Sequence, residues 1–260
     1  MNGTKKFNEN IFVGCAGWSL RKEYAASFPH DGTHLERYAA GFNAVEVNSS
    51  FYRSHQTKTY QRWAASTPPQ FRFAIKVPKE ITHLRRLVDV QSLFAQFALE
   101  IHGLGEKLGP LLVQLPPSLV FDKSIAERFF TELRSQIDAT VVCEPRHSSW
   151  FSLEAEALLL THGIERVVAD PVVHPRGAEP SGNKQICYFR LHGSPRIYFS
   201  AYDEARLIAM AEQILKIASA GTLVWCIFDN TAEGTALQNA LELNIQIEKK
   251  LKSGLVKISP

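Results

Sequence analysis

Short apolar segments alternate with amphipathic stretches along almost the whole chain, and this alternation limits the possible folds most. Segments rich in Val, Ile and Phe predict eight strands, at 11–17, 44–49, 71–77, 110–115, 139–144, 165–169, 185–192 and 222–228. Helical spacing of apolar residues predicts helices at 33–41, 57–66, 90–107, 123–137, 152–162, 203–220 and 233–252. Strands that alternate with helices over short connections are parallel. Eight such units in 260 residues predict one (β/α)8 barrel of the TIM type, with a doubly wound open sheet as the alternative.

One unit of this pattern is irregular. The sixth and seventh predicted strands are joined by DPVVHPRGAEPSGNK (170–184), which contains three prolines and two glycines. Because proline interrupts helices, we expect a loop where the sixth helix would stand. No linker or change of composition marks a second domain, so residues 1–260 are predicted to form a single domain, with 1–10 as a flexible tail.

Composition excludes several classes of protein. Apolar residues make up 45% and charged residues 21%, which is typical of a globular domain and not of a disordered chain. The net charge of +3 is too mild to indicate nucleic-acid binding. No apolar run is long enough to span a membrane, and the polar start MNGTKKFNEN is unlike a signal peptide. The cysteines, at 15, 143, 187 and 226, form no CxxC pair, so reduced thiols in a cytoplasmic protein are expected. The oligomeric state is not indicated.

Polar residues recur at alternate positions near the carboxyl ends of the predicted strands. Since side chains alternate along a strand, residues spaced by two point to the same face. The inward face then carries Glu46, Asn48, Lys76, Gln114, Glu144, Arg146, Tyr188, Arg190 and His192, and Asp170, Asp229 and Asn230 join them at the ends of the sixth and eighth strands. Active sites of such barrels lie at this face. An inert network of ion pairs is the alternative, but a buried ion costs several kcal/mol even after relaxation. A functional pocket is therefore favoured.

The same strand ends carry motifs of a known family. They are GCAGW (14–18), VEVNSSFYR (45–53), Trp63 followed by TPPQFRFAIKVPKEITH (67–83), LGPLLVQLPP (108–117), EPRHSSW (144–150), YFRLHG (188–193) and FDNTAEG (228–234) with NAL (239–241). In this order the chain resembles the YecE-like family, also called domain of unknown function seventy-two. The resemblance implies a TIM-like barrel that is widespread in bacteria and has no established biochemical activity. It assigns no catalytic role to any residue.

Three classes of function fit these residues. The first is an enzyme or binder for an anionic small molecule, such as a sugar phosphate or a nucleotide, in which Lys and Arg hold the anion. Carboxylates and a histidine would then transfer protons, and the catalytic candidates are Glu46, Glu144, His192 and Asp229. The substrate-binding candidates are Asn48, Tyr52, Lys76, His83, Gln114, Arg146, Trp150, Arg190 and Asn230.

The second class is a metal-dependent barrel, such as a phosphoesterase similar to endonuclease IV or a sugar isomerase, with Glu, Asp and His as ligands. Three cations on the same face would weaken a divalent site, so neither a metal nor another cofactor is predicted. GxSxG, HExxH and a Walker loop are missing, and GLGEKL (103–108) lacks the third glycine of a dinucleotide fingerprint. The third class is a non-catalytic barrel that binds a protein or metabolite. If the protein is an enzyme, a hydrolase or an isomerase is expected.

Overall fold

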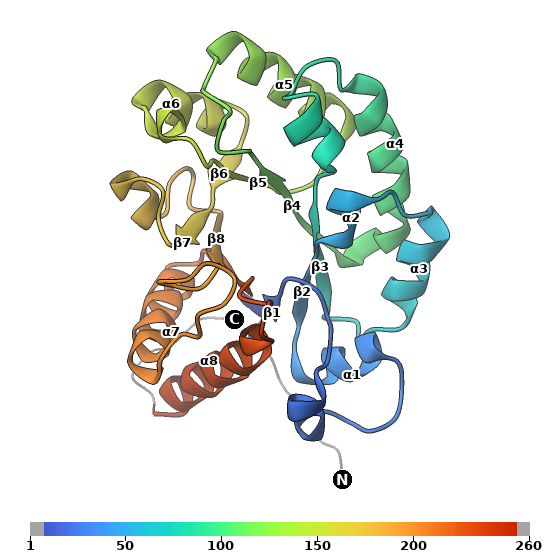
Figure 1. The fold of residues 1–260 in the computed structure, drawn as a ribbon, viewed down its shortest axis with the longest axis vertical. Coiled ribbons are helices and arrows are strands. Elements are labelled where there is room, and N and C mark those ends of the chain that lie inside the picture. Colours follow the sequence, from blue (N-terminus) through green and yellow to red (C-terminus); the bar gives the residue numbers. More distant parts are fainter. Residues whose placement is uncertain (1–7, 254–260) are drawn as a thin grey trace. The chain divides into compact units, whose positions relative to one another are not determined.

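The structure is a computed structural model that describes residues 8–253, and its strands form two parallel sheets (Figure 1). One sheet has the strand order β1-β9-β8-β7 and the other has the order β2-β3-β4-β5-β6. The chain divides into two compact units. Within the described residues, the first unit comprises 8–45, 169–171 and 185–253, and the second comprises 46–168 and 172–184.

The first unit is built on β1 (Ile11–Cys15), β9 (Leu223–Phe228) and β8 (Ile186–Leu191), with the end of β7 (Val168–Asp170). Its helices are α1 (His34–Gly41), α7 (Glu204–Ser219) and α8 (Thr235–Lys252), and η1 (Lys22–Ser27) is a 3-10 helix. Helices α7 and α8 pack side by side (Figure 1). Asp203 caps α7 by accepting the Arg206 N–H at 2.8 Å, as its place before the apolar stripe predicts. The stripe residues Leu207, Met210, Ala211, Ile214 and Leu215 are all buried.

The second unit is built on β2 (Ala44–Val47), β3 (Arg72–Lys76), β4 (Leu108–Gln114), β5 (Val141–Glu144) and β6 (Ile164–Arg166). Its α-helices are α2 (Ser49–Tyr52), α3 (Thr57–Ala65), α4 (Gln91–Ile101), α5 (Lys123–Gln136) and α6 (Leu153–Thr161). A π-helix, η2 (Glu80–Leu84), follows β3, and η3 (His102–Lys107) and η4 (Ser148–Phe151) are 3-10 helices. Helices α3 to α6 follow one another along one side of this sheet (Figure 1). Asp122 caps α5, as predicted.

Side chains take the place of a backbone ladder on the free edge of β1. The Val224 N–H donates to the Asn10 carbonyl, and the Ala16 N–H donates to the Phe228 carbonyl. Alternate residues along β1 therefore direct their backbone groups toward β9. The residues between them turn their backbone groups the other way, where the Asn43 amide accepts from Val13 N–H and donates to the Ile11 carbonyl, at 3.1 and 2.7 Å. On the same edge the Tyr38 hydroxyl accepts from the Cys15 N–H at 2.8 Å and donates to the Ala44 carbonyl at 2.9 Å. Ladder pairing stops there because side chains already satisfy these groups.

The predicted strand at 165–169 is two strands. Val167 separates β6 from β7, which belong to different sheets, and its N–H donates to the Cys143 carbonyl at 2.8 Å. The described residues therefore form nine strands instead of the eight predicted, and their ladders do not close into one barrel. The parallel α/β class is confirmed.

Three further local predictions can be compared with the structure. Between β7 and β8 the chain forms only a short 3-10 helix, η5 (Pro175–Ala178), so the predicted lack of a regular helix there is confirmed. The helix predicted at 90–107 ends as an α-helix at Ile101, and Gly105 breaks the following 3-10 helix with φ 53°. Residues 1–7 of the predicted flexible tail lie outside the described residues. Among the helices described, none is long and apolar enough to cross a membrane.

Candidate functional site

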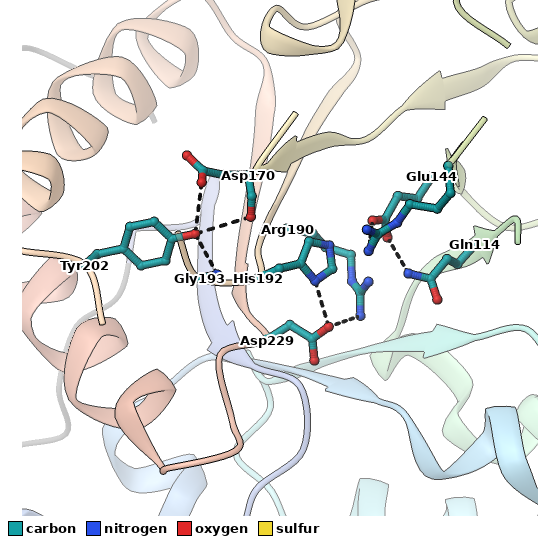
Figure 2. A network of polar contacts seen from close by, with 9 residues as sticks. Gln114, Glu144, Asp170, Arg190, His192, Gly193, Tyr202 and Asp229 are labelled. Carbon is teal, nitrogen blue, oxygen red and sulfur yellow. Dashed lines mark hydrogen bonds and ion pairs between the residues drawn. The ribbon is translucent and has the colours of Figure 1, made fainter. Parts of the chain in front are cut away.

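The first unit brings an arginine and a histidine onto one carboxylate oxygen (Figure 2). Arg190 lies near the end of β8, His192 follows that strand, and Asp229 follows the neighbouring strand β9. Asp229 Oδ2 accepts from Arg190 Nη2 at 3.0 Å and from His192 Nδ1 at 3.0 Å. Leu191 pairs with Phe228, so the residues that follow the two strands lie at the same level. This register brings His192 close to Asp229.

This centre is largely shielded from water. Arg190 and His192 are 0% exposed and Asp229 is 7% exposed. Because Asp229 accepts from Nδ1, the neutral imidazole carries its proton on Nδ1 and its lone pair on Nε2. A carboxylate that orients an imidazole in this way prepares the other ring nitrogen for proton transfer. The arrangement suits a general acid or base.

Asp170, at the end of β7, is held by Tyr202, as Figure 2 shows, and by Arg206. Arg206 Nη2 lies 2.6 Å from Asp170 Oδ2, and the Tyr202 hydroxyl lies 3.3 Å from Asp170 Oδ1. The same hydroxyl accepts the Gly193 N–H at 2.9 Å. Burial, and then the charge of Asp170, raises the pKa of Tyr202, so its hydroxyl stays protonated at neutral pH and can donate to the carboxylate.

The loop after β8 is tied to α8 by two asparagines. Asn230 Nδ2 donates to the Ser200 carbonyl and to Asn239 Oδ1, both at 3.0 Å. The Asn239 amide also accepts from the Tyr202 N–H and donates to the Tyr202 carbonyl, again at 3.0 Å. Asn230, a predicted substrate-binding residue, is 0% exposed, and its amide hydrogens hold this loop.

The second unit forms its own polar group from the ends of β4 and β5 (Figure 2). Gln114 Nε2 donates to Glu144 Oε2 at 3.2 Å, and Arg146 Nη2 lies 2.7 Å from Glu144 Oε1. Glu144 is buried, whereas the Arg146 side chain is 15% exposed. Gln114 and Glu144 pair in register across the two strands, so the period-two reading predicts their proximity correctly.

An aromatic ring lies beside the cation at the end of β3. Lys76 Nζ lies 4.1 Å from the centroid of Phe51, a half-buried residue of α2. The His83 ring meets the Phe51 ring edge-on at 4.9 Å, and its Nδ1 lies 2.9 Å from Thr82 Oγ1. Burial, and secondarily the charge of Lys76, lowers the pKa of His83. His83 is therefore predominantly neutral at neutral pH.

The remaining predicted site residues fall into different environments. Glu46 is buried in β2, and Asn48 is half-buried where α2 begins. Tyr52, at the end of α2, is 68% exposed. Trp150 is buried, with its ring against Phe121 and its N–H donating to the Leu119 carbonyl at 2.9 Å. The Trp150 side chain thus packs inside the second unit.

Sequence reasoning missed two residues of the first unit. Arg206 holds Asp170, and Asn239 holds both Asn230 and the loop after β8. Asn239 left a detectable signal, because it is a polar residue on the buried stripe of α8. Such a residue needs hydrogen-bond partners, which here come from Asn230 and Tyr202.

No group of three His, Cys, Asp or Glu side chains suited to a metal ion occurs within residues 8–253. The cysteines of the described chain are buried, and burial raises the pKa of Cys15 to about 12 and also raises those of Cys143 and Cys226. These three thiols therefore stay protonated at neutral pH, which disfavours them as nucleophiles.

Comparison with known proteins identifies the family. Residues 12–258 match the family described as "Protein of unknown function DUF72". This chain belongs to the DUF72 family. The UPF0759 protein YecE of Escherichia coli K12 is 28% identical over 166 residues, which span 62% of this chain and 59% of YecE. The chain thus matches less than two thirds of this relative's length.

Solved structures agree with this assignment. A DUF72 family protein of Thermotoga maritima is 27% identical, with a TM-score of 0.76 over 93% of this chain and 99% of that chain. A fusion protein described as xylose isomerase-like TIM barrel/4-hydroxyphenylpyruvate dioxygenase has a TM-score of 0.51 at 15% identity, over 96% of this chain and 45% of that chain. The second likeness concerns the fold alone, and it relates the DUF72 fold to TIM barrels.

Proposed function

We propose that this DUF72 protein is an enzyme that acts on an anionic small molecule, a sugar phosphate or a nucleotide, by general acid–base catalysis. His192 is the proton-transfer group, Asp229 orients it, and Arg190 holds Asp229. The observation that carries the proposal is the convergence of Arg190 and His192 on Asp229 Oδ2. A buried cluster of one anion and two potential cations is costly to build, and its polar groups sit at strand ends, where parallel α/β proteins place active sites.

Support for an anionic substrate comes from the second unit. Lys76 ends β3 and Arg146 follows β5, so both belong to the carboxyl ends of one parallel sheet. Arg146 contacts Glu144 through Nη2, and a planar guanidinium presents its donors in a geometry that matches the oxygens of a phosphate. Glu144 is the second candidate for proton transfer, with Gln114 and Arg146 fixing its orientation.

The proposal also includes a more detailed description of the fold. The sequence predicts a single (β/α)8 barrel with residues 1–260 as one domain, and the likeness to a xylose isomerase-like TIM barrel supports the barrel. An isomerase or a hydrolase fits a protein whose candidate catalytic groups are a histidine and carboxylates. A cytoplasmic location and binding of a small anion remain parts of the proposal.

Ligand-induced stabilisation tests the binding half of this proposal. Thermal unfolding of the full chain is followed with inorganic phosphate, ribose 5-phosphate and a nucleoside monophosphate at millimolar concentration. A ligand at about 100 times its Kd stabilises the fold by about 2.7 kcal/mol, which raises the Tm by roughly 5–10 °C in a chain of this size. Arg146→Met should reduce the shift, whereas Arg128→Met on the exposed face of α5 should retain it. No shift with any of the three anions would refute the proposal.

The chemical half is tested with the ligands that bind. Each is incubated with the protein in D2O and followed by proton and phosphorus NMR for isomerisation, hydrolysis or solvent exchange. Loss of a general acid–base group typically lowers the rate by about 10²–10⁴-fold, and His192→Gln should produce a loss of this order. His192→Gln with unchanged turnover would exclude His192 as the proton-transfer group.

A further inference from the structure

An aromatic shelf stands on the second unit, next to its cations. It consists of Phe51 and Tyr52 on α2, and His83 on the π-helix η2. Phe51 meets Tyr52 edge-on at 5.0 Å and His83 edge-on at 4.9 Å, so the three rings form one cluster with Phe51 at its centre. Helix α2 follows β2 and η2 follows β3, which places the shelf at the carboxyl ends of neighbouring strands.

The outer part of this shelf faces solvent. Tyr52 is 68% exposed, and the adjacent Leu84 is 61% exposed, while Phe51 and His83 are half-buried. A single exposed aromatic residue is ordinary on a protein surface. Here the exposed ring continues a row of rings that leads toward the buried cation Lys76, which is the arrangement expected of a platform for a planar group.

Two ammonium groups accompany the rings. Lys76 Nζ lies 4.1 Å from the Phe51 centroid, and Lys79 Nζ lies 5.9 Å from the Tyr52 centroid. Lys79 is exposed and can therefore meet a ligand directly. A ring that stacks on Tyr52 would have this positive charge beside it. A ligand that combines a planar ring with a phosphate satisfies both features at once.

Contacts beneath the shelf hold it in place before any ligand binds. Ser50 Oγ contacts the carbonyls of Val47 and Lys76 at 2.8 and 2.7 Å, which fixes α2 against β2 and β3. Thr82 contacts His83 Nδ1, and Arg86 donates from both Nη atoms to Ser118, at 3.0 and 2.9 Å.

The backbone after η2 is also unusual, because Arg86, Leu87 and Asp89 all have positive φ angles. π-helices and left-handed non-glycine residues are often associated with functional sites. The π-helix that carries His83 and the turn that follows it thus both have features often found at functional sites.

We propose that the aromatic shelf stacks the base of a nucleoside phosphate, with Tyr52 as the platform and Lys79 as a phosphate contact. This inference rests on the proposed function and narrows its substrate class from small anions in general to anions that carry a planar ring. Each base stacked on an aromatic side chain contributes a gain that corresponds to about 5- to 150-fold in affinity. A nucleoside monophosphate should therefore bind that much more tightly than ribose 5-phosphate.

Calorimetric titration of the full chain with AMP, UMP, ribose 5-phosphate and adenosine tests this inference. Tyr52→Ala should abolish the preference for AMP over ribose 5-phosphate and leave the Kd for ribose 5-phosphate unchanged. Tyr52→Phe keeps the ring and should retain the preference. Leu84→Ala is the matched control, since Leu84 follows His83 in η2, is similarly exposed and apolar, and has no ring. Lys79→Met should weaken the binding of AMP and leave the binding of adenosine unchanged.

The outcomes separate this inference from the proposed function. If ribose 5-phosphate binds and AMP binds no more tightly, the shelf is not a base platform, although the proposed anionic substrate stands. If adenosine binds through Tyr52 and no phosphorylated compound binds better, Tyr52 stacks a base, but the phosphate contact at Lys79 and the proposed anionic substrate are both wrong. Binding of a single-stranded oligonucleotide without binding of any mononucleotide would overturn the inference in favour of a nucleic-acid surface.

Discussion

Replacing Tyr38 by Phe should destabilise the protein far more than loss of one hydroxyl suggests. The Tyr38 ring is fully buried on α1 and lies 4.7 Å from the Phe42 ring. Its hydroxyl accepts the N–H of Cys15 at the end of β1 and donates to the carbonyl of Ala44 at the start of β2. Tyr38→Phe keeps the packing of the ring and removes the group that both backbone atoms contact.

The magnitude follows from what is left behind. A buried polar group deprived of its partner costs about 1–3 kcal/mol, and this substitution strands one donor and one acceptor. The two costs sum to about 2–6 kcal/mol, and we expect a loss of about 2–4 kcal/mol because local relaxation or an entering water recovers part of it. For a chain of this size, this corresponds to a drop in Tm of roughly 4–16 °C.

Urea and thermal unfolding followed by circular dichroism measure this loss. Tyr24→Phe is the matched control, because the Tyr24 hydroxyl contacts Gln238 Oε1 at 3.2 Å in an exposed place. Water replaces that contact, so the control should change the free energy of unfolding by less than about 0.5 kcal/mol. If Tyr38→Phe changes stability as little as the control does, the hydroxyl does not take the place of a ladder at the edge of β1.

Three further predictions concern stability. Gly14→Ala would place a Cβ 2.1 Å from the Ala44 carbonyl oxygen, so it should cost at least about 3 kcal/mol or yield insoluble protein, as measured by soluble yield and urea midpoint. Burial lowers the pKa values of His55 and His83, so the unfolded chain binds protons more readily and stability falls as pH drops below about 6.5. The urea midpoint should therefore be lower at pH 5.5 than at 7.5, and an unchanged or higher midpoint would contradict this. Lys107 Nζ contacts the carbonyls of Ala64, in the last turn of α3, and of Thr67, just after it, so Lys107→Met should cost about 1–2 kcal/mol in urea unfolding, and a neutral effect would show that water replaces these contacts.

Features that depend on local chemistry could be predicted from the sequence. The apolar stripe of α7 and the caps Asp122 and Asp203 occur where helical spacing and capping preferences place them. Alternation along β4 and β5 correctly predicts that Gln114 and Glu144 share a face, because the period of a strand is a property of the backbone itself. These are short-range regularities, and they need no knowledge of the rest of the chain.

The division of the strands into two sheets could not be predicted in this way. Asn43 and Tyr38 lie in the segment between β1 and β2, and in the sequence they are an ordinary loop residue and an ordinary helix residue. Their side chains can hydrogen-bond the backbone of β1 only because the fold brings α1 and the residues after it to the edge of that strand. The interruption of the strand at Val167 could not be predicted from the sequence either, since Val favours the strand conformation.

The pairing of polar groups in the candidate site could not be predicted from the sequence either. Periodicity indicates that Arg190 and His192 share a face of β8, and that Asp229 stands at the end of the next strand, but it does not indicate which groups pair. With Arg190 considered alone, its guanidinium is a natural anion ligand; in the structure it donates to Asp229 on the oxygen that also holds His192. Arg190, which the sequence predicts as a substrate ligand, thus contacts the carboxylate that also contacts His192. A cation at a strand end can be assigned to a substrate only after its contacts within the protein are known. Of the predicted cations, Arg146 remains the best candidate for binding an anion, because its side chain is partly exposed.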